Sequence, residues 1–177
     1  MRIISGMFKG RRFQLPKNLK ARPTTDFAKE NLFNILNNRL DFEELNVLDL
    51  FAGTGSMGFE LLSRGARFAT FVEQYPLHVH FIKDVAQKLA CSNCTVVTGD
   101  AYRFVETSLA KFDLIFADAP YADPKMESIP DRIFARNLLN TDGLLIVEHG
   151  KSSHFENHPN FKEIRTYGSV HFSFFEG

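Results

Sequence analysis

Residues 47–58 read Val-Leu-Asp-Leu-Phe-Ala-Gly-Thr-Gly-Ser-Met-Gly, and this stretch decides the fold of the 177-residue chain. Its apolar beginning indicates a buried parallel strand, and a glycine-rich turn and the start of a helical pattern follow. The glycines at 53, 55 and 58 match the G-x-G-x-x-G spacing of nucleotide-binding loops, which is a weak signal by itself. We therefore expect a strand, a ligand-binding loop and a helix in this order.

Asp49 helps to decide which of two ligands such a loop would bind. In a dinucleotide site the pyrophosphate lies against the loop and the helix N-terminus. A carboxylate at the end of the strand would repel phosphates and would attract a ligand that carries an ammonium group and a sulfonium. The charge therefore favours S-adenosylmethionine (SAM) over NAD, and we expect Asp49 to contact the ammonium group.

Strand and helix patterns alternate from Asn46 onward. Strands are predicted at 46–50, 68–73, 94–98, 112–117 and 143–147, and helices at 56–64, 76–89, 101–109 and 129–138. This alternation predicts an α/β fold with a doubly wound, mostly parallel sheet and helices on both faces. Residues 162–167 and 170–175 are expected to form a closing antiparallel hairpin, which is typical of methyltransferases rather than dehydrogenases.

The N-terminal region differs from the rest in charge. Residues 1–30 hold eight Lys or Arg and two acids, whereas residues 31–177 hold thirteen and nineteen. A basic β-hairpin at 2–5 and 12–15 and a helix ending near residue 38 are predicted, so we expect an appendage at 1–40 and a catalytic domain at 41–177. The basic arm suggests a polyanion as partner, and a merely solvated hairpin is an equally good interpretation. The candidate RNA contacts are Arg2, Lys9, Arg11 and Arg12.

Acidic residues close or directly follow four successive predicted strands, at the sheet edge where such folds bind ligands. They are Asp49, Glu73, Asp100 and Asp118. Glu73 is suited to accept hydrogen bonds from ribose hydroxyls, and Asp100 is suited to accept from an adenine amino group. One acid after a strand is usually a helix cap or a solvated residue, but four in succession indicate a ligand site.

The stretch Asp118-Ala119-Pro120-Tyr121 is the expected reaction centre. An exocyclic amine on a base is a poor nucleophile because its lone pair is delocalised into the ring. The Asp118 carboxylate and the Ala119 carbonyl can each accept one N–H and aim the lone pair at a methyl group. Pro120 stiffens the turn, and Tyr121 can stack on the base.

Composition gives only broad limits. The hydrophobic share of 44% and the charged share of 24% are ordinary for a globular protein. There is no apolar run of membrane-spanning length and no signal-peptide core at the start, so we expect a cytoplasmic protein, and we expect a monomer. Cys91 and Cys94 form a C-x-x-C that suits a redox pair or half a zinc site, but no further ligands stand at the right spacing, so no metal is expected.

With these residues in view, the chain resembles class I SAM-dependent methyltransferases, and most of all the RsmD-type enzymes that methylate guanine N2 in small-subunit (16S) rRNA. The resemblance covers Arg2–Gly6 with Lys9–Arg11, Arg22–Asp26 with Glu30 and Phe33, Asp49–Gly55, Glu73 and Asp118–Tyr121. It implies that Arg22 to Thr25 help close the SAM site, that the basic hairpin meets RNA and that a pre-assembled ribosomal particle is the substrate. The expected cofactor site therefore comprises Arg22, Thr24, Thr25, Asp49, Phe51, Gly53, Thr54, Gly55, Glu73, Asp100 and Ala101. Ala119 departs from the Asp-Pro-Pro-Tyr or Phe pattern of the family but keeps the carbonyl acceptor.

Other functions remain open at this point. The same tetrapeptide serves adenine-N6 methylation of DNA or RNA, although no separate target-recognition domain is evident. An RNA-binding module with weak catalysis and an NAD-dependent dehydrogenase are further alternatives.

Overall fold

The computed structural model describes residues 1–17, 19 and 25–177, so the expected cofactor ligands Arg22 and Thr24 lie outside the described residues. The strands are β1 (Asn46–Leu50), β2 (Phe68–Glu73), β3 (Cys94–Thr98), β4 (Phe112–Ala117), β5 (Leu139–His149), β6 (Phe161–Tyr167) and β7 (Val170–Glu176). The helices are α1 (Asp26–Leu36), α2 (Ser56–Ser63), α3 (Pro76–Lys88), α4 (Ala101–Thr107) and α5 (Ile129–Ala135), with a short 3₁₀ helix η1 (Met126–Ser128). The predicted α/β fold with a mostly parallel sheet is confirmed.

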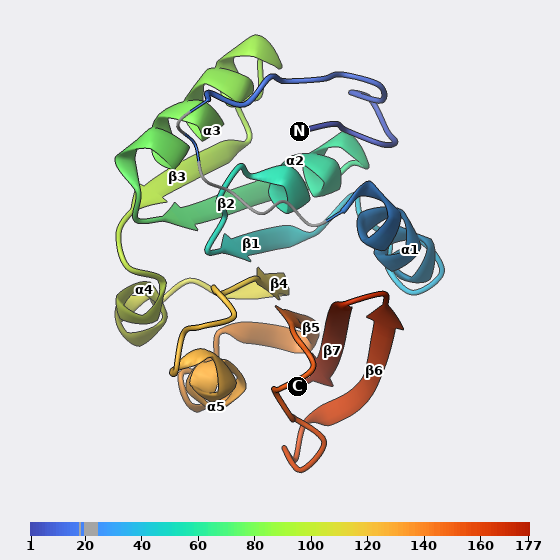
Figure 1. The fold of residues 1–177 in the computed structure, drawn as a ribbon, viewed down its shortest axis with the longest axis vertical. Helices are drawn as coiled ribbons and strands as arrows, with labels where there is room; N and C mark the ends of the chain where they lie inside the picture. The colour runs from blue at the N-terminus through green and yellow to red at the C-terminus, as the bar shows by residue number, and fades with distance from the viewer. Residues whose placement is uncertain (18, 20–24) are drawn as a thin grey trace.

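All seven strands belong to one sheet with the order β3-β2-β1-β4-β5-β7-β6 (Figure 1). The strands β1 to β5 pair in parallel, and β7 pairs antiparallel to both β5 and β6. The strand order reverses direction between β1 and β4, which creates a crevice at their carboxyl ends. That crevice is where an open α/β sheet binds its ligand.

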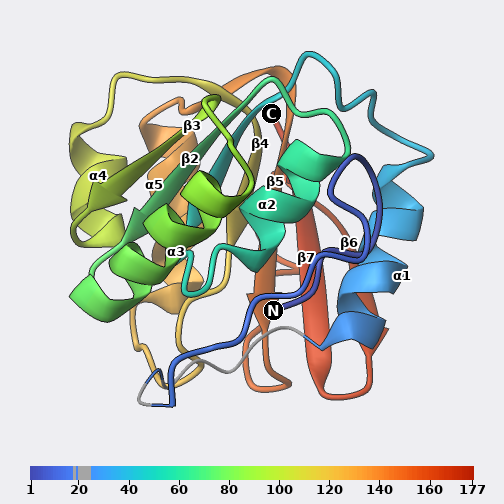
Figure 2. The ribbon, with the colours of Figure 1, turned by 90° about the horizontal axis from the view of Figure 1, so that it is seen from above.

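Helices cover both faces of the sheet, and each face has its own hydrophobic cluster. Helices α1, α2 and α3 lie on one face, and α4 and α5 lie on the other (Figure 2). Phe59, Phe71 and Phe174 are fully buried in the first cluster, and Ile115 and Leu145 are fully buried in the second. Alternate residues of the central strands face opposite clusters, so their apolar runs are continuous.

The N-terminal segment folds back on itself without forming named strands. The two arms meet at a single antiparallel bridge between Arg2 and Arg12, and the N–H of Ile3 donates to the carbonyl of Arg11 at 3.0 Å. The regular hairpin pattern ends there because the N–H groups of Ile4 and Ser5 donate instead to the carboxylate of Glu60 at 2.8 and 3.0 Å. These bonds attach the segment to α2.

A buried ionic network holds this attachment in place. Lys29 of α1 and Glu60 of α2 are 1% and 0% exposed, and their Nζ and Oε2 atoms lie 3.4 Å apart. Nε of Arg64 donates to Oε1 of Glu60 at 2.9 Å, and Nζ of Lys29 donates to the carbonyl of Arg2 at 2.7 Å. Ile3 belongs to the same hydrophobic cluster as α2, so among the described residues the N-terminal segment shares the core of the sheet.

None of the helices in the described part of the chain is both long enough and apolar enough to span a membrane.

Candidate active site

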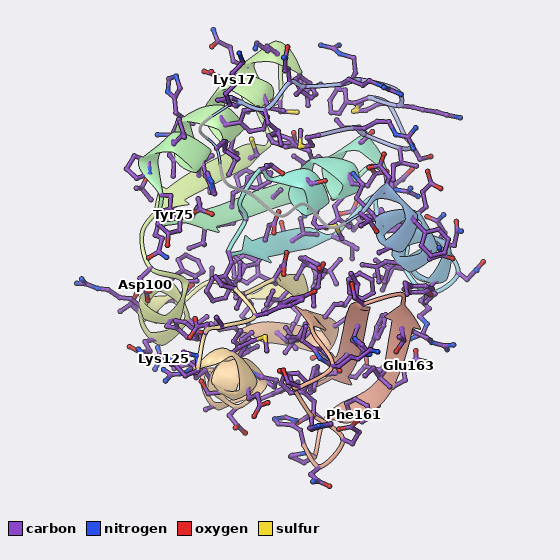
Figure 3. All side chains as sticks on the ribbon, viewed as in Figure 1. Lys17, Tyr75, Asp100, Lys125, Phe161 and Glu163 are labelled. Carbon is purple, nitrogen blue, oxygen red and sulfur yellow. The ribbon has the colours of Figure 1, made fainter. Side chains whose placement is uncertain are left out.

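A cavity of about 460 Å³ lies at the carboxyl ends of the parallel strands β1 to β5. Its walls come from the residues that follow these strands and from the first turns of α3 and α4. Figure 3 shows Tyr75, Asp100 and Lys125 along this edge of the molecule. The lining residues are Phe51, Gly53, Val72–Tyr75, His78, Gly99–Tyr102, Asp118–Asp123 and Glu148.

The structure brings most of the residues predicted from the sequence to this cavity. All four residues of the expected reaction centre line it, namely Asp118, Ala119, Pro120 and Tyr121. Of the expected cofactor residues, Phe51, Gly53, Glu73, Asp100 and Ala101 line it. Thr25, Asp49, Thr54 and Gly55 are not among its lining residues.

Glu73 ends β2 and is 5% exposed. Its Oε2 accepts from the N–H of Gly53 at 2.7 Å, and its Oε1 accepts from the N–H of Tyr75 at 2.8 Å. These bonds tie the glycine loop to the end of β2 and fix the carboxylate at the cavity wall. A carboxylate oxygen has more than one lone pair, so each oxygen can accept a further hydrogen bond from a ligand hydroxyl.

His78 adds a second polar group beside Glu73. Its Nδ1 is buried, has no hydrogen-bond partner in the described part of the chain, and lies 3.6 Å from Oε2 of Glu73. An orphaned polar atom on a cavity wall is suited to a ligand or a water molecule. The sequence indicates only a surface or packing residue at His78, since nothing in its local pattern distinguishes it.

The neighbouring part of the cavity is aromatic. Asp100 caps α4 by accepting from the N–H of Arg103 at 2.8 Å, which places α4 so that Tyr102 faces the cavity. The rings of Phe51 and Tyr102 meet edge to face with centroids 5.3 Å apart. The hydroxyl of Tyr102 donates to Oδ2 of Asp123 at 2.8 Å. Burial, followed by this bond, raises the pKa of Tyr102, so its hydroxyl stays protonated.

Asp49 has a different position from the one expected. Its side chain is 3% exposed, and its Oδ2 accepts from the N–H of Gly58 in the first turn of α2 at 2.9 Å. Burial raises the pKa of Asp49 to about 8, and the bond from Gly58 opposes this shift. The Asp49 side chain thus occupies the position at the helix N-terminus that a dinucleotide pyrophosphate would need.

The loop glycines allow the turn of the backbone and the close packing of α2 on β2. Gly53 and Gly55 have φ angles of +55° and +72°, in the left-handed region that favours glycine. A Cβ on Gly58 would lie 2.3 Å from Cε1 of the buried Phe71, so α2 can approach β2 only with glycine there. On the cavity side, a Cβ on Gly99 would meet nothing within 4 Å. The open space beside Gly99 is part of the room for a ligand.

The reaction-centre loop is fixed from two sides. Ala119 is fully buried in the second hydrophobic cluster, which anchors the loop at the sheet. The hydroxyl of Tyr121 lies 3.4 Å from Oε1 of Glu148, and a Cβ on Gly150 would lie 3.2 Å from the Tyr121 ring. Gly150 thus lets the Tyr121 ring approach the chain that follows β5 closely. Glu148 was not predicted as a site residue, although it is an acid at the end of a predicted strand.

The charge of the lining decides which ligands fit. It includes five carboxylate residues, Glu73, Asp100, Asp118, Asp123 and Glu148, and among its described residues no Lys or Arg. Such a lining repels a pyrophosphate and attracts a cation. The sulfonium and ammonium groups of SAM, its ribose hydroxyls and its adenine ring fit this combination of acids, Glu73 and aromatic walls. The residues present therefore suit SAM and do not suit NAD.

The expected RNA contacts are distributed unevenly. Arg2 is engaged within the chain, because its Nε lies 3.1 Å from Oδ2 of Asp26 and its Nη2 lies 2.9 Å from Oε1 of Glu30. Its ion pairs hold α1, which gives it a structural role that the charge count did not reveal. Lys9 and Arg12 are exposed.

The exposed basic residues do not border the cavity. Nη2 of Arg11 donates to the carbonyl of Lys88, the last residue of α3, and the N–H of Met7 donates to the carbonyl of Ser63, the last residue of α2. Both helices begin at the cavity edge, so their ends lie at the opposite edge of the sheet. The length of the eight-residue α2 alone separates the cavity edge from the basic segment by about 12 Å.

Two further features of the sequence stay apart from the cavity. Thr25 caps α1, where its Oγ1 accepts from the N–H of Ala28 at 3.1 Å. Cys91 lies in the turn before β3 and Cys94 is the first residue of that strand, and both are free thiols. Burial raises the pKa of Cys91 to about 11, which disfavours the reactive thiolate. In the described part of the chain, no group of three or more His, Cys, Asp or Glu side chains is arranged to hold a metal ion.

Comparison with known proteins gives consistent results. The family model described as "Conserved hypothetical protein 95" matches residues 1–176. Ribosomal RNA small subunit methyltransferase D of Haemophilus influenzae is 34% identical over 155 residues, which are 85% of this chain and 79% of that protein. Its namesake in Escherichia coli K12 is 33% identical over 149 residues, 84% and 74% of the two chains. A solved structure of a hypothetical protein from Thermus thermophilus is 27% identical with a TM-score of 0.87, and the match covers 100% of this chain and 99% of that one.

Proposed function

This chain belongs to the family described as conserved hypothetical protein 95, the RsmD-type methyltransferases, and we propose that it methylates the exocyclic N2 amino group of a guanine in small-subunit rRNA with SAM as methyl donor. The observation that carries the proposal is the acidic cavity at the switch point of the sheet, with Asp118–Tyr121 on its wall. Action on rRNA assigns the protein to the cytoplasm, where we propose that it works as a monomer on rRNA or on the small-subunit particle.

The cavity wall divides into a donor side and an acceptor side. Glu73 is suited to the ribose hydroxyls, and Phe51, Asp100, Ala101 and Tyr102 are suited to the adenine. When bound, SAM supplies an electrophilic methyl group on a positively charged sulfur. The carboxylates around the cavity stabilise that charge and exclude an anionic ligand.

Asp118 and its neighbours act on the base. The Asp118 carboxylate and the Ala119 carbonyl each accept one N–H of the target amine, which directs the nitrogen lone pair away from the ring. Tyr121 lies at the cavity wall with its hydroxyl near Glu148, and its ring is suited to stack on the base face. The acceleration comes from positioning and electrostatics, and Asp118 takes up the departing proton or relays it to water.

The replacement of the family proline by Ala119 leaves this arrangement possible. The acceptor is the backbone carbonyl, which alanine also provides. The loop loses the restriction that a second proline places on the unfolded chain, about 0.4–1 kcal/mol. Ala119 itself is fully buried and anchors the loop in the core.

The test combines methyl transfer with product identification. Small-subunit particles from bacteria that lack this gene are incubated with the protein and labelled SAM, and the rRNA is digested to nucleosides for mass spectrometry. We expect N2-methylguanosine. N6-methyladenosine as the labelled product would support the adenine-N6 alternative, and absence of any labelled nucleoside in active preparations would refute the proposal.

A matched pair of variants links the product to the cavity. Asp118→Ala is expected to abolish transfer while SAM affinity, measured by calorimetry, changes little. The control is Asp84→Ala on the exposed face of α3, where the carboxylate pairs only with the exposed His80 in the described structure. Asp84→Ala should retain full turnover. Wild-type turnover in Asp118→Ala would move the reaction centre elsewhere.

A further inference from the structure

Glu148 has no part in orienting the target amine in the mechanism above, yet it is one of the most buried acids in the described part of the protein. It lies near the end of β5, is 4% exposed and lines the cavity together with Asp118 and Tyr121. Burying a carboxylate is costly unless it has hydrogen-bond partners. The hydroxyl of Tyr121 is one such partner at 3.4 Å from Oε1. A buried carboxylate that lines the cavity is also placed to contact a ligand.

The sheet register places Glu148 beside Asp118. Ala117 of β4 pairs with Val147 of β5, so the next residues of these two parallel segments are Asp118 and Glu148. Neighbouring strands are about 4.8 Å apart. Both side chains line the cavity together with Tyr121, so a base that stacks on Tyr121 can turn its edge toward both.

Hydrogen-bond chemistry decides which base suits this wall. Carboxylates at neutral pH only accept hydrogen bonds. The Watson–Crick edge of guanine offers three N–H donors side by side, one on N1 and two on N2. The edge of adenine offers two donors on N6 and a lone pair on N1, which would face a carboxylate oxygen. Asp118 and the Ala119 carbonyl account for the N–H groups of the amine, which leaves the N1–H of guanine for another acceptor.

We propose that Glu148 is this acceptor and that it selects guanine over adenine by binding the N1–H of the target base. The inference rests on the proposed function, because it assumes that the exocyclic N2 amine is the methyl acceptor. Enzymes that modify a base commonly read its Watson–Crick edge in this way. Tyr121 then has two roles, since its ring stacks on the base and its hydroxyl holds the Glu148 carboxylate in place.

The test uses a base that differs from guanine at N1. 2-Aminopurine retains the N2 amine but has a lone pair in place of the N1–H and a hydrogen in place of O6. Small-subunit particles are reconstituted with rRNA that carries either guanosine or 2-aminopurine riboside at the methylated position, and kcat/KM is measured for both. The wild-type protein is expected to prefer guanine by about 10- to 100-fold, as fits one hydrogen bond to a charged group.

Glu148→Gln is the informative variant. Glutamine keeps an oxygen for the Tyr121 hydroxyl and gains an NH₂ group that can donate to the N1 lone pair of 2-aminopurine. We expect the preference for guanine to fall at least tenfold, because activity on guanine drops and activity on 2-aminopurine rises or stays. Tyr121→Phe is the matched control, since it removes the hydroxyl and keeps the carboxylate. Because the stacking ring and the Glu148 carboxylate both remain, it should keep most of the activity on guanine and reduce the preference by less than Glu148→Gln does.

The outcomes separate the two proposals. Equal loss on both bases in Glu148→Gln would reduce Glu148 to a structural role and overturn the inference, while wild-type production of N2-methylguanosine would leave the proposed function intact. A wild-type protein that makes no N2-methylguanosine would overturn both. If Glu148→Gln does not fold, the kcat/KM values of the wild-type protein on the two bases still test the inference. Equal kcat/KM on guanine and 2-aminopurine would overturn it.

Discussion

Gly6 offers the sharpest test of how the N-terminal segment is held on the body. A Cβ added to Gly6 would lie 1.7 Å from the carbonyl oxygen of Ser63, at the end of α2. Gly10 provides a matched control in the same segment. Its φ of +82° is nearly the same as the +79° of Gly6, but a Cβ there meets nothing within 4 Å. Gly6→Ala and Gly10→Ala therefore have the same backbone strain, and only Gly6→Ala adds a steric clash with Ser63.

The magnitude follows from the contacts that the clash disrupts. A left-handed alanine costs about 1–2 kcal/mol, and the stiffer unfolded chain returns about 0.4–1 kcal/mol, so Gly10→Ala should lose about 1 kcal/mol. Gly6→Ala must also move the segment away from Ser63. This movement breaks the bonds from the N–H groups of Met7 and Phe8 to Ser63, which are 2.7 and 2.9 Å long. At about 1 kcal/mol each, they add about 2 kcal/mol.

The bonds to Glu60 raise the cost further. Glu60 is fully buried, and it accepts from the N–H groups of Ile4 and Ser5. Weakening hydrogen bonds to a buried charge costs about 1.5–3 kcal/mol each. We expect Gly6→Ala to be at least about 2–4 kcal/mol less stable than Gly10→Ala. For a protein of this size each kcal/mol shifts Tm by about 2–4 °C, so the two Tm values should differ by about 4–16 °C.

Thermal unfolding followed by circular dichroism, with urea titrations for the free energy of unfolding, measures this difference. Equal Tm values for the two variants would refute the reasoning, because they would show that the segment leaves Ser63 without cost. The fold of each variant is checked by comparing its far-ultraviolet spectrum before heating with that of the wild type.

The other predictions concern the ligands and pH. Glu73→Gln should weaken SAM binding at least about tenfold in calorimetry. The glutamine NH₂ group would face a backbone N–H that the carboxylate now accepts, and one acceptor for the ribose hydroxyls would be lost. Unchanged SAM affinity would show that Glu73 does not contact the cofactor. Alanine at Lys9, Arg11 and Arg12 together should flatten the salt dependence of RNA binding in filter-binding titrations, by up to about 0.7 in log–log slope per lost phosphate contact, whereas an unchanged slope would mean that these charges are only solvated. Because burial raises the pKa of Asp49 to about 8, the folded state holds a proton that the unfolded state releases near the ordinary value of 3.8. Stability from this group is thus present below pH 3.8 and lost as pH rises toward 8, so the stability of the wild type relative to Asp49→Asn should decrease over that range in urea titrations; a constant difference would contradict it.

The sequence alone determined the order and the type of nearly all the secondary structure. The apolar runs at 46–50, 68–73, 94–98 and 112–117 match β1 to β4, because strands buried on both faces need continuous apolar residues. The glycine spacing predicted the loop before α2. β5 is longer than predicted, because it starts at Leu139 rather than near residue 143. Leu139 pairs with Phe112, and an irregularity in the register separates this pair from the rest of the β4–β5 pairing. The polar residues that follow Leu139 interrupt the apolar pattern, so the sequence did not reveal this start.

The sequence also determined which edge of the sheet carries the chemistry. An acid after a strand lies at the carboxyl edge whatever the packing, so Glu73, Asp100 and Asp118 could be assigned to one site. Their residue types, with Tyr121, were sufficient to favour an amine-methylating enzyme. The resemblance in the N-terminal motifs narrowed this to one family, and the match of the family model to residues 1–176 confirms it.

Only the tertiary structure decided what each charged side chain contacts. Asp49 points to the N–H of Gly58 rather than into the cavity, and Arg2 pairs with Asp26 and Glu30 rather than remaining exposed. Glu148 reaches the cavity because β4 and β5 are neighbours in the sheet, although 30 residues separate it from Asp118 in the chain. The physical reason is that apolar periodicity is a local property of the chain. The partner of a carboxylate or a guanidinium is instead whichever polar group the packing of distant segments brings within about 3 Å.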